Sequence, residues 1–347
     1  MSSLTMPSIN TSARLPTKIV AHEPTKVISR SLSRMALIEA PTPLGSLETY
    51  SEHLEFEHPI AIKREDLTSK LYGGNKVRNL EFILSDVLEK KVNSIKTLVP
   101  YGSNFAAAIA SECRRLSIPL KLYQFMADSN PQTHAHAQFA ARHHAELKTH
   151  EGRSGPAKAL FDYLNDQNSY AITPGGSNIL GATGHLRALL EGLEQYRNVF
   201  THNQDPTHIF IGAGTCGNSA GLLAGLTHLR SQTKLVAVRC ASPLICNRRK
   251  IIRLANQTLS YLGSTERVKP GQLEITEAPA HIKYGVPSPA AILEARKFFD
   301  LEKISLDLTY TSKVIAALAH MKRHARIAET DRVLYWHTYS SIAHPMT

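Results

Sequence analysis

Residues 208–221 read His-Ile-Phe-Ile-Gly-Ala-Gly-Thr-Cys-Gly-Asn-Ser-Ala-Gly, an apolar run that passes directly into a glycine-rich turn. Leu222, Leu223 and Leu226 follow at helical spacing, so the segment predicts a strand, a tight turn and a helix. Glycine lets backbone amides approach a ligand closely, and the N-terminus of a helix attracts anions. The stretch therefore indicates an α/β fold that binds a phosphate-like anion at this turn.

Two common nucleotide sites do not fit the turn. It lacks the Gly-Lys-Ser/Thr ending of a nucleotide P-loop. About 20 residues further on, where a dinucleotide-binding fold places an acid, the sequence has Val238-Arg239-Cys240. ATP and NAD are therefore disfavoured.

The alternation of short apolar runs and longer amphipathic stretches continues through most of the chain from residue 60 onward. Its clearest helical pattern is Leu80, Ile83, Leu84, Val87 and Leu88, with apolar side chains at i, i+3, i+4, i+7 and i+8. Parallel strands need crossover connections that are usually helical, so the alternation predicts parallel sheets covered by helices, in one doubly wound sheet or two smaller ones. The expected strands span residues 94–100, 120–125, 146–150, 170–174, 208–211, 234–239 and 333–336.

The composition is that of a globular enzyme. The 347 residues are 42% hydrophobic and 20% charged, which excludes a disordered, collagenous or coiled-coil chain. A net charge of +11 is compatible with phosphorylated ligands, acidic substrates or nucleic acid, and does not choose among them. No apolar run approaches the ~18 residues that a membrane-spanning helix needs. We expect no membrane association.

The cysteines and the N-terminal residues bear on the cellular compartment of the protein. Cys113, Cys216, Cys240 and Cys246 are scattered and form no C-x-x-C pair, which predicts buried thiols in a reducing, cytosolic compartment. Residues 1–22 are rich in Ser and Thr and contain no acid, and they loosely resemble a mitochondrial presequence. The alternative interpretation is a disordered or strand-forming lead-in.

Three further turns carry candidate chemistry. Gly73-Gly74-Asn75-Lys76 leads into a helix, where the dipole and partial burial would lower the pKa of Lys76 and suit it to Schiff-base chemistry. A solvated lysine beside a loop is the alternative. Ser103-Asn104, at the start of another helix, could cradle a carboxylate or a flat ring, and is also what an ordinary N-cap looks like. Residues 173–178, Thr-Pro-Gly-Gly-Ser-Asn, form a similar turn or a capped turn without a ligand.

Together these segments resemble the 1-aminocyclopropane-1-carboxylate deaminase and D-cysteine desulfhydrase family of pyridoxal-phosphate enzymes. The likeness begins with Ala-Pro-Thr-Pro-Leu at 40–44 and continues through Lys-Arg-Glu-Asp-Leu-Thr at 63–68 and Gly-Gly-Asn-Lys-Val-Arg-Asn-Leu-Glu at 73–81. It covers roughly residues 40–338 and implies the two-domain, three-layer α/β fold of the tryptophan synthase β-subunit, fold type II. A large cofactor-binding domain (40–84 plus 186–347), a small domain (85–185) and an N-terminal lead-in (1–39) are expected.

The resemblance also implies residue roles. Lys76 would carry pyridoxal 5′-phosphate as a Schiff base and shuttle the substrate Cα proton. Asn104 would lie against the cofactor ring or its 3′ oxygen, and Ser103 near the substrate carboxylate. The cofactor phosphate would be bound by Gly214, Thr215, Cys216, Gly217 and Asn218.

Tyr284 and Tyr310 match the family's two active-site tyrosines, and the residue after the second one bears on the reaction type. By the resemblance, the cofactor ring nitrogen meets Glu there in the cyclopropane deaminases and Thr in desulfhydrase-like members; this chain has Thr311. A carboxylate favours a protonated ring and a strong electron sink, whereas a hydroxyl can donate to a neutral ring nitrogen. Ring opening of the cyclopropane needs the stronger sink, whereas β-elimination from a thiol-bearing amino acid has a good leaving group and needs less. Thr311 therefore favours D-cysteine, with pyruvate, sulfide and ammonia as products.

Three departures from the family pattern fall in the expected active site. The common His-Ala-Arg after Ser-Asn is Phe105-Ala106-Ala107, which predicts an apolar wall near the substrate. In the phosphate turn the usual Ser-Gly-Gly-Thr ends in Asn218, and a late glycine of the family is Tyr339. We expect cofactor binding to survive, because backbone N–H groups carry most phosphate recognition, and the substrate to be unusual.

Other functions remain as alternatives: a 1-aminocyclopropane-1-carboxylate deaminase, a non-catalytic cofactor or amino-acid binding protein, and a nucleic-acid binder. The last is motivated only by the net charge, since the basic triplet Arg248-Arg249-Lys250 has a helix surface as its simple explanation. His136 and His143 share a face of a predicted helix but lie too far apart along it to bind one metal, so no metal site is predicted. A homodimer acting on a small amino acid, without nucleic acid, is expected.

Overall fold

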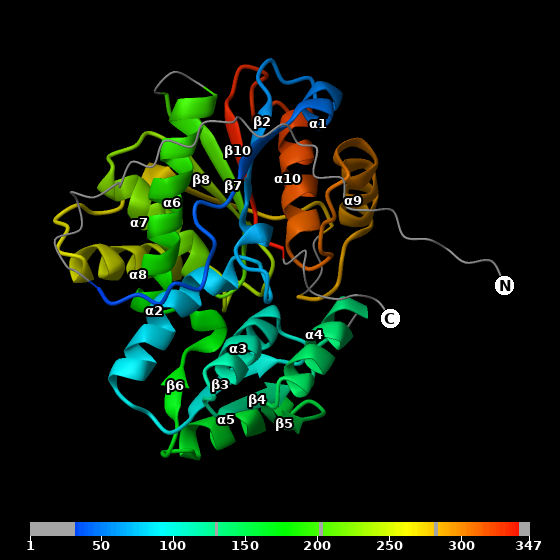
Figure 1. Ribbon diagram of the computed structural model, residues 1–347. Coiled ribbons are helices and arrows are strands. Elements are labelled where there is room, and N and C mark those ends of the chain that lie inside the picture. The colour runs from blue at the N-terminus through cyan, green and yellow to red at the C-terminus, as the bar shows by residue number, and fades with distance from the viewer. Residues whose placement is uncertain (1–31, 129–130, 201–203, 281–283, 340–347) are drawn as a thin grey trace.

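The computed structural model describes residues 32–128, 131–200, 204–280 and 284–339, which form two sheets with helices on their faces (Figure 1). The larger sheet has the strand order β1-β2-β10-β7-β8-β9. Only β1 runs antiparallel to its neighbour, and the other pairs are parallel. Its strands are β1 (Leu44–Leu47), β2 (Ile60–Arg64), β7 (His208–Ala213), β8 (Lys234–Arg239), β9 (Leu273–Thr276) and β10 (Val333–His337).

Helices cover both faces of the larger sheet and bury its apolar side chains. Along β7, Ile209 and Ile211 face one helical layer and Phe210 faces the other, as the alternation of a strand buried on both sides requires. One layer consists of α6 (Ile179–Val199), α7 (Gly217–His228) and α8 (Arg248–Tyr261). The other consists of α1 (Glu48–His53), α9 (Pro289–Glu302) and α10 (Thr311–Arg323).

The smaller sheet is entirely parallel, with the order β5-β4-β3-β6. Its strands are β3 (Ile95–Pro100), β4 (Leu120–Phe125), β5 (Glu146–His150) and β6 (Tyr170–Ile172). A single apolar cluster joins β3, β4 and β6 to three helices, α2 (Lys76–Glu89), α3 (Asn104–Arg115) and α4 (Pro131–Arg142). Helix α5 (Gly155–Asn165) contacts β3, β4 and β5.

The expected three-layer α/β architecture is confirmed, and so are the seven expected strands, to within a few residues at their ends. Strands β1, β2 and β9 were not predicted. β2 ends in Lys63 and Arg64, charges that conceal a buried strand, and β9 lies at a sheet edge with a polar alternation. The division at residues 84/85 and 185/186 stays a prediction; these two points fall inside α2 and α6, so each of these helices would pass from one domain to the other.

Other expectations can be placed in the structure. All four cysteines are free and buried, and Arg248-Arg249-Lys250 forms the exposed first turn of α8. His134 and His136 lie on α4, whereas His143 and His144 lie beyond its end. The helix predicted to contain His136 and His143 together is therefore shorter than expected. The described residues contain no group of three or more His, Cys, Asp or Glu that could hold a metal, and none of their helices is long and apolar enough to cross a bilayer. Residues 1–22 lie outside the described part of the chain.

Candidate active site

Turns from both halves of the molecule meet where the two sheets face each other. Ser177, after β6, donates a hydrogen bond to Thr215 Oγ1 (2.6 Å) and accepts one from the Gly217 N–H (3.1 Å), both in the turn after β7. Tyr72, before α2, donates to Asn104 Oδ1 at the start of α3 (2.6 Å). These bonds bring together the N-termini of α2, α3, α6 and α7, whose positive dipole ends favour an anion between them.

The glycine-rich turn leaves its backbone donors open. Within the described residues, the N–H groups of Thr215 and Cys216 make no hydrogen bond to another backbone group. The Asn218 carboxamide is used inside the turn: Nδ2 donates to Gly212 O (2.8 Å) and Oδ1 accepts from the Ser219 N–H (2.7 Å). Unpaired amides at the start of α7 therefore fit a phosphate, and the Asn218 side chain shapes the turn instead of pointing at a ligand.

Lys76 is the first residue of α2, as the sequence predicted. Burial lowers the pKa of its ammonium from 10.5 to about 8, and no described side chain forms an ion pair with it. The preceding Gly73 and Gly74 have φ of 77° and 76°, values that side-chain-bearing residues rarely adopt, so glycine is needed to bend the chain into the helix. An amine with a lowered pKa and an anion-binding turn are the two groups that an aldehyde-bearing phosphate ester requires.

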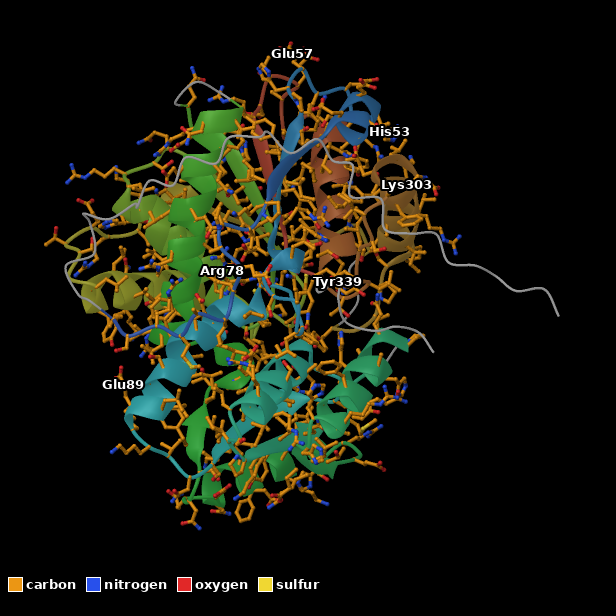
Figure 2. The ribbon with its side chains drawn as sticks, in the orientation of Figure 1. His53, Glu57, Arg78, Glu89, Lys303 and Tyr339 are labelled. Atoms are coloured by element: carbon orange, nitrogen blue, oxygen red, sulfur yellow. The ribbon has the colours of Figure 1, made fainter. Side chains whose placement is uncertain are left out.

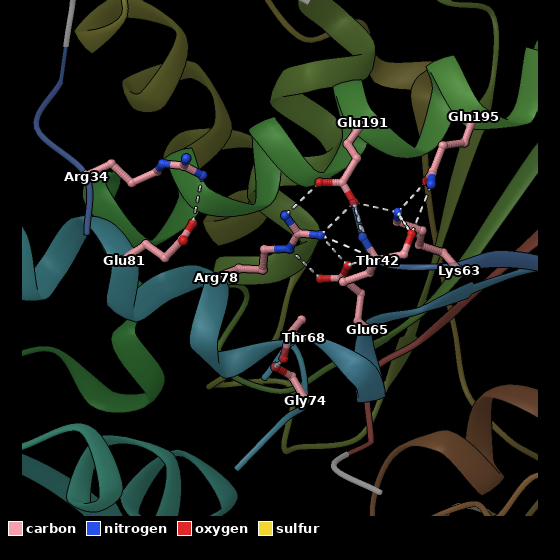
Figure 3. Close-up of polar contacts among 10 residues, drawn as sticks. All are labelled: Arg34, Thr42, Lys63, Glu65, Thr68, Gly74, Arg78, Glu81, Glu191 and Gln195. Carbon is pink, nitrogen blue, oxygen red and sulfur yellow. Dashed lines mark hydrogen bonds and ion pairs between the residues drawn. The ribbon is translucent and has the colours of Figure 1, made fainter. Parts of the chain in front are cut away.

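A buried ion network anchors the first turn of α2 (Figure 3). The Arg78 guanidinium donates to both carboxylate oxygens of Glu65 and to both of Glu191. Lys63, fully buried on β2, donates to Glu191 Oε1 (2.6 Å) and to the Thr42 carbonyl (2.7 Å). The Lys-Arg-Glu-Asp motif and the arginine two residues after Lys76 are thus structural partners that tie β2 and α2 to α6.

The network contains a residue that sequence reasoning missed. Glu191 lies 113 positions from Arg78, within the amphipathic pattern of α6, and nothing in its neighbourhood marks it as functional. Its carboxylate joins two buried cations. Burial raises the pKa of this carboxyl, but the charges and hydrogen bonds of Arg78 and Lys63 outweigh it and lower the pKa to about 2. The available signal was the pair of cations in an otherwise apolar setting, which requires buried acids somewhere in the chain.

Ser103 and Asn104 stand at the start of α3, and part of their bonding capacity is already used. Ser103 is the N-cap of the helix and its hydroxyl accepts from the Ala106 N–H (3.4 Å), which confirms the N-cap interpretation. With Asn104 Oδ1 accepting from Tyr72, the amide nitrogen of Asn104 is the donor that remains for the cleft. Phe105 points away: it is 2% exposed and packs against Gly176, so it forms part of the core instead of the predicted apolar wall of the cleft.

Two tyrosines face the glycine turn across the site. A Cβ added to Gly214 would lie 2.9 Å from the Tyr310 hydroxyl, so this close approach requires glycine. Tyr284 stands edge-on to Tyr310, with ring centroids 6.0 Å apart, and the two hydroxyls share a hydrogen bond. Burial raises the pKa of Tyr284 to about 12 and that of Tyr310 well above 10, so both remain protonated at neutral pH.

Thr311 is buried at the start of α10 and bonded to a carboxylate. Its hydroxyl donates to Asp307 Oδ2 (2.6 Å) and accepts from the Asp307 N–H (2.7 Å). Asp307 also accepts from the backbone N–H groups of Thr309, Tyr310 and Thr311, and so holds the turn that leads into α10. Asp307 was not predicted as a site residue, and its position just ahead of the Tyr-Thr pair was the only available signal.

A cleft is lined from both halves of the molecule. Gln132 of α4 accepts a hydrogen bond from the Leu308 N–H (3.1 Å) and also bonds to Tyr339, which lies at the junction of the two halves (Figure 2). Among the predicted site residues, Asn104, Tyr284 and Tyr310 line this cleft, and the glycine turn approaches it where Gly214 lies against Tyr310. Lys76 is not among the lining residues. Its lining residues are Gly102, Asn104, Gln132, Thr133, His136, Tyr284, Asp307, Thr309 and Tyr310.

Comparisons with known proteins agree with this geometry. A family model described as pyridoxal-phosphate dependent enzyme matches residues 35–338. The D-cysteine desulfhydrases of Salmonella typhi and Salmonella newport are each 28% identical to the chain over 314 residues, which is 88% of this chain and 93% of theirs.

Solved structures share the fold at lower identity. A structure described as an ACC deaminase homologue superposes with a TM-score of 0.76 at 24% identity, covering 90% of this chain and 93% of that one. A hydrogen sulfide-producing enzyme from Fusobacterium nucleatum superposes with a TM-score of 0.61 at 15% identity, covering 88% of this chain and 97% of that one. The chain therefore belongs to the family of pyridoxal-phosphate dependent enzymes, with the fold of type II and pyridoxal 5′-phosphate as its cofactor.

Proposed function

We propose that the enzyme catalyses β-elimination from a small thiol-bearing amino acid, with D-cysteine as the leading substrate and pyruvate, sulfide and ammonia as products. One observation carries most of the proposal: Lys76, with a pKa of about 8 and no described ion partner, begins α2, and the glycine turn leaves the N–H groups of Thr215 and Cys216 without a backbone partner. The D-cysteine desulfhydrases that match 88% of the chain favour elimination over other reactions of the family.

Each proposed site residue has a task that its environment supports. When bound, pyridoxal phosphate supplies the electron sink that lets the substrate Cα lose a proton. Lys76 Nζ takes that proton, because a pKa of about 8 keeps part of the amine free near neutral pH. Backbone N–H groups of the turn from Gly214 to Asn218 bind the phosphate at the start of α7. Ser103 and the N-terminus of α3 hold the substrate carboxylate, and Asn104 donates to the cofactor.

Tyr284 and Tyr310 are assigned to the leaving group. Both are phenols at neutral pH because burial raises the pKa of each. A phenol at the cleft can donate its proton to a departing sulfur, and the hydrogen bond between the two hydroxyls lets the second tyrosine stabilise the first while it lacks that proton. Such a donor assists elimination, since the substrate sulfur leaves more easily when it receives a proton as the C–S bond breaks.

The environment of Thr311 changes the argument made from sequence. The Thr311 proton is directed to Asp307, so its hydroxyl could accept from a protonated ring nitrogen and would have to leave Asp307 in order to donate to a neutral one. Thr311 therefore does not by itself favour the weaker electron sink, and the relatives carry the preference for elimination. Ring opening of 1-aminocyclopropane-1-carboxylate is retained as the second candidate, supported by the likeness to the deaminase homologue.

The deciding experiment is a substrate panel. Purified protein loaded with pyridoxal phosphate is incubated with D-cysteine, L-cysteine, D-serine and 1-aminocyclopropane-1-carboxylate, and keto acid, sulfide and ammonia are measured. Pyruvate and sulfide from D-cysteine support the proposal. Keto acid from the cyclopropane alone supports the deaminase, and a bound cofactor without turnover of any substrate supports a binding protein.

Lys76→Ala provides the control, because it should remove both the visible absorbance of the bound cofactor and the activity. A wild-type protein that takes up no cofactor would contradict the proposal. A cytosolic homodimer without a nucleic-acid partner is part of the proposal, and the four free cysteines support its cytosolic location.

A further inference from the structure

Cys216 occupies a strained position in the turn proposed to bind the cofactor phosphate. Its φ is 78°, in the left-handed region, and it is the N-cap of α7. A residue other than glycine held there costs on the order of 1 kcal/mol, and such strain concentrates at functional sites. Glycine would remove the strain, so the thiol side chain is the feature that distinguishes this position.

The Cys216 thiol is paired with a second one. Its Sγ donates to the carbonyl of Ile245 (3.6 Å), the residue before Cys246, and the two thiols hydrogen-bond to each other. Both cysteines are buried in the same apolar cluster. Cys216 lies in the turn between β7 and α7, and Cys246 lies near the end of the short loop that connects β8 to α8. Leu244, two residues before Cys246 in that loop, is 87% exposed.

The two thiols differ in reactivity. Hydrogen bonds from the Cys246 thiol and the Asn247 N–H, together with the charges of Lys250 and Arg239, lower the pKa of Cys216. The same contact and burial raise the pKa of Cys246. The more acidic thiol attacks an oxidant first, and a neighbouring thiol resolves the product.

We propose that Cys216 and Cys246 form a reversible disulfide when the enzyme meets a hydroperoxide, and that this bond weakens cofactor binding. The Cys216 sulfur attacks the peroxide, the O–O bond breaks, and a sulfenic acid and one water or alcohol result. The Cys246 sulfur then displaces the sulfenic oxygen as water and forms the S–S bond, so the two thiols lose two electrons and two protons to the peroxide. The effect on the cofactor rests on the proposed role of the turn.

The expected weakening has a geometric cause. A disulfide brings its sulfurs to about 2.05 Å, much closer than two hydrogen-bonded thiols. Cys216 would be drawn toward the loop before α8, and the N–H groups of Thr215 and Cys216 would move with it. An anion held by backbone amides loses affinity when those donors are displaced.

The test uses the full chain, with and without bound pyridoxal phosphate, titrated with hydrogen peroxide. We expect a mass loss of two hydrogen atoms, a peptide that links Cys216 to Cys246, and an at least tenfold increase in the dissociation constant for pyridoxal phosphate. Dithiothreitol should reverse all three changes. In Cys246→Ser, or Cys246→Ala if the serine variant folds poorly, peroxide should leave the cofactor affinity within twofold.

Two other cysteines serve as matched controls. Cys113 lies in the smaller half and Cys240 bonds to the Val238 carbonyl, and burial raises the pKa of each to about 12. Cys113→Ser and Cys240→Ala should retain the peroxide response. The proposal is overturned if no Cys216–Cys246 peptide forms, or if it forms without change in affinity. Failure of the reduced protein to bind pyridoxal phosphate would instead contradict the proposed function, since disulfide formation is read by mass alone.

Discussion

The charge on Lys76 makes folding less favourable, and this effect can be measured without any substrate. Its pKa is about 8 in the folded protein against 10.5 in the unfolded chain, so between these values the unfolded state binds more protons. Stability contributed by this site is therefore lowest below pH 8 and rises as the pH increases toward 10.5. We predict that Lys76→Met raises the melting temperature of the apoprotein at pH 7 and that this gain shrinks at pH 9.5.

The exposed lysine Lys158 of α5 provides the control for that comparison. Lys158→Met should change the melting temperature little, and equally at both pH values. If Lys76→Met leaves the melting temperature unchanged at pH 7, the lysine is solvated, which was the alternative interpretation of the sequence.

Helix α10 begins at a carboxylate whose removal should be costly. Asp307→Ala deprives three backbone N–H groups and the buried Thr311 hydroxyl of their acceptor. Loss of these hydrogen bonds to the turn costs about 1 kcal/mol and the loss of the Thr311 acceptor about as much again, so we predict a loss of about 2 kcal/mol in the free energy of unfolding by urea. Asp307→Asn keeps one carbonyl oxygen and should recover part of the loss; equal stability of all three proteins would contradict this account.

Helices α2 and α6 are joined by the network around Glu191, and breaking it should destabilise the fold. Glu191→Gln removes the negative charge that Arg78 and Lys63 share. We predict that this substitution lowers the free energy of unfolding by about 3 kcal/mol at pH 7. The pKa of Glu191 is about 2 in the folded protein against 4.5 unfolded, so its contribution is complete above pH 4.5 and is lost as the pH falls toward 2.

The difference in the free energy of unfolding between wild type and Glu191→Gln should accordingly become smaller in acid. Denaturation curves at pH 7 and pH 3 measure it, and Glu194→Gln on the same helix is the matched control, expected to change stability by less than about 0.5 kcal/mol. A difference that does not depend on pH would show that packing, and not charge, holds the two helices together.

Whether a segment forms a helix or a strand was predictable from its local sequence pattern. Which distant residues it contacts was not. Strand β8 was predicted with its observed ends, because burial on both faces leaves a continuous apolar run inside it. Strand β4 was also predicted with its observed ends, although Lys121 and Gln124 interrupt its apolar residues. β2 was missed because its buried Lys63 is neutralised by Glu191, an acid 128 positions away, while Arg64 pairs with the nearby Asp66. A strand whose charges are neutralised by long-range partners carries no local signal.

At the scale of the whole molecule, the sequence predicted which turns carry chemistry, and the fold determined which of their groups are free. The order of the turns predicted a shared site, and their mutual hydrogen bonds agree with that expectation. It could not be predicted that Asn218 folds back on Gly212, that Phe105 enters the core, or that Thr311 bonds to Asp307. Each of these depends on side-chain direction, which the sequence pattern does not specify.

The two halves of the molecule touch across the cleft through Gln132, and this contact should affect substrate binding more than cofactor binding. Gln132 connects α4 of the smaller half to the Leu308 N–H and to Tyr339. Its loss removes a hydrogen bond worth about 1 kcal/mol, so we predict that Gln132→Ala raises KM for the amino acid about five- to tenfold. The absorbance of bound pyridoxal phosphate should persist, because Gln132 touches neither Lys76 nor the glycine turn. Gln138→Ala, an exposed glutamine of the same helix, should leave KM unchanged, and an equal effect of the two substitutions would place the cause in α4 itself rather than in the contact between the halves.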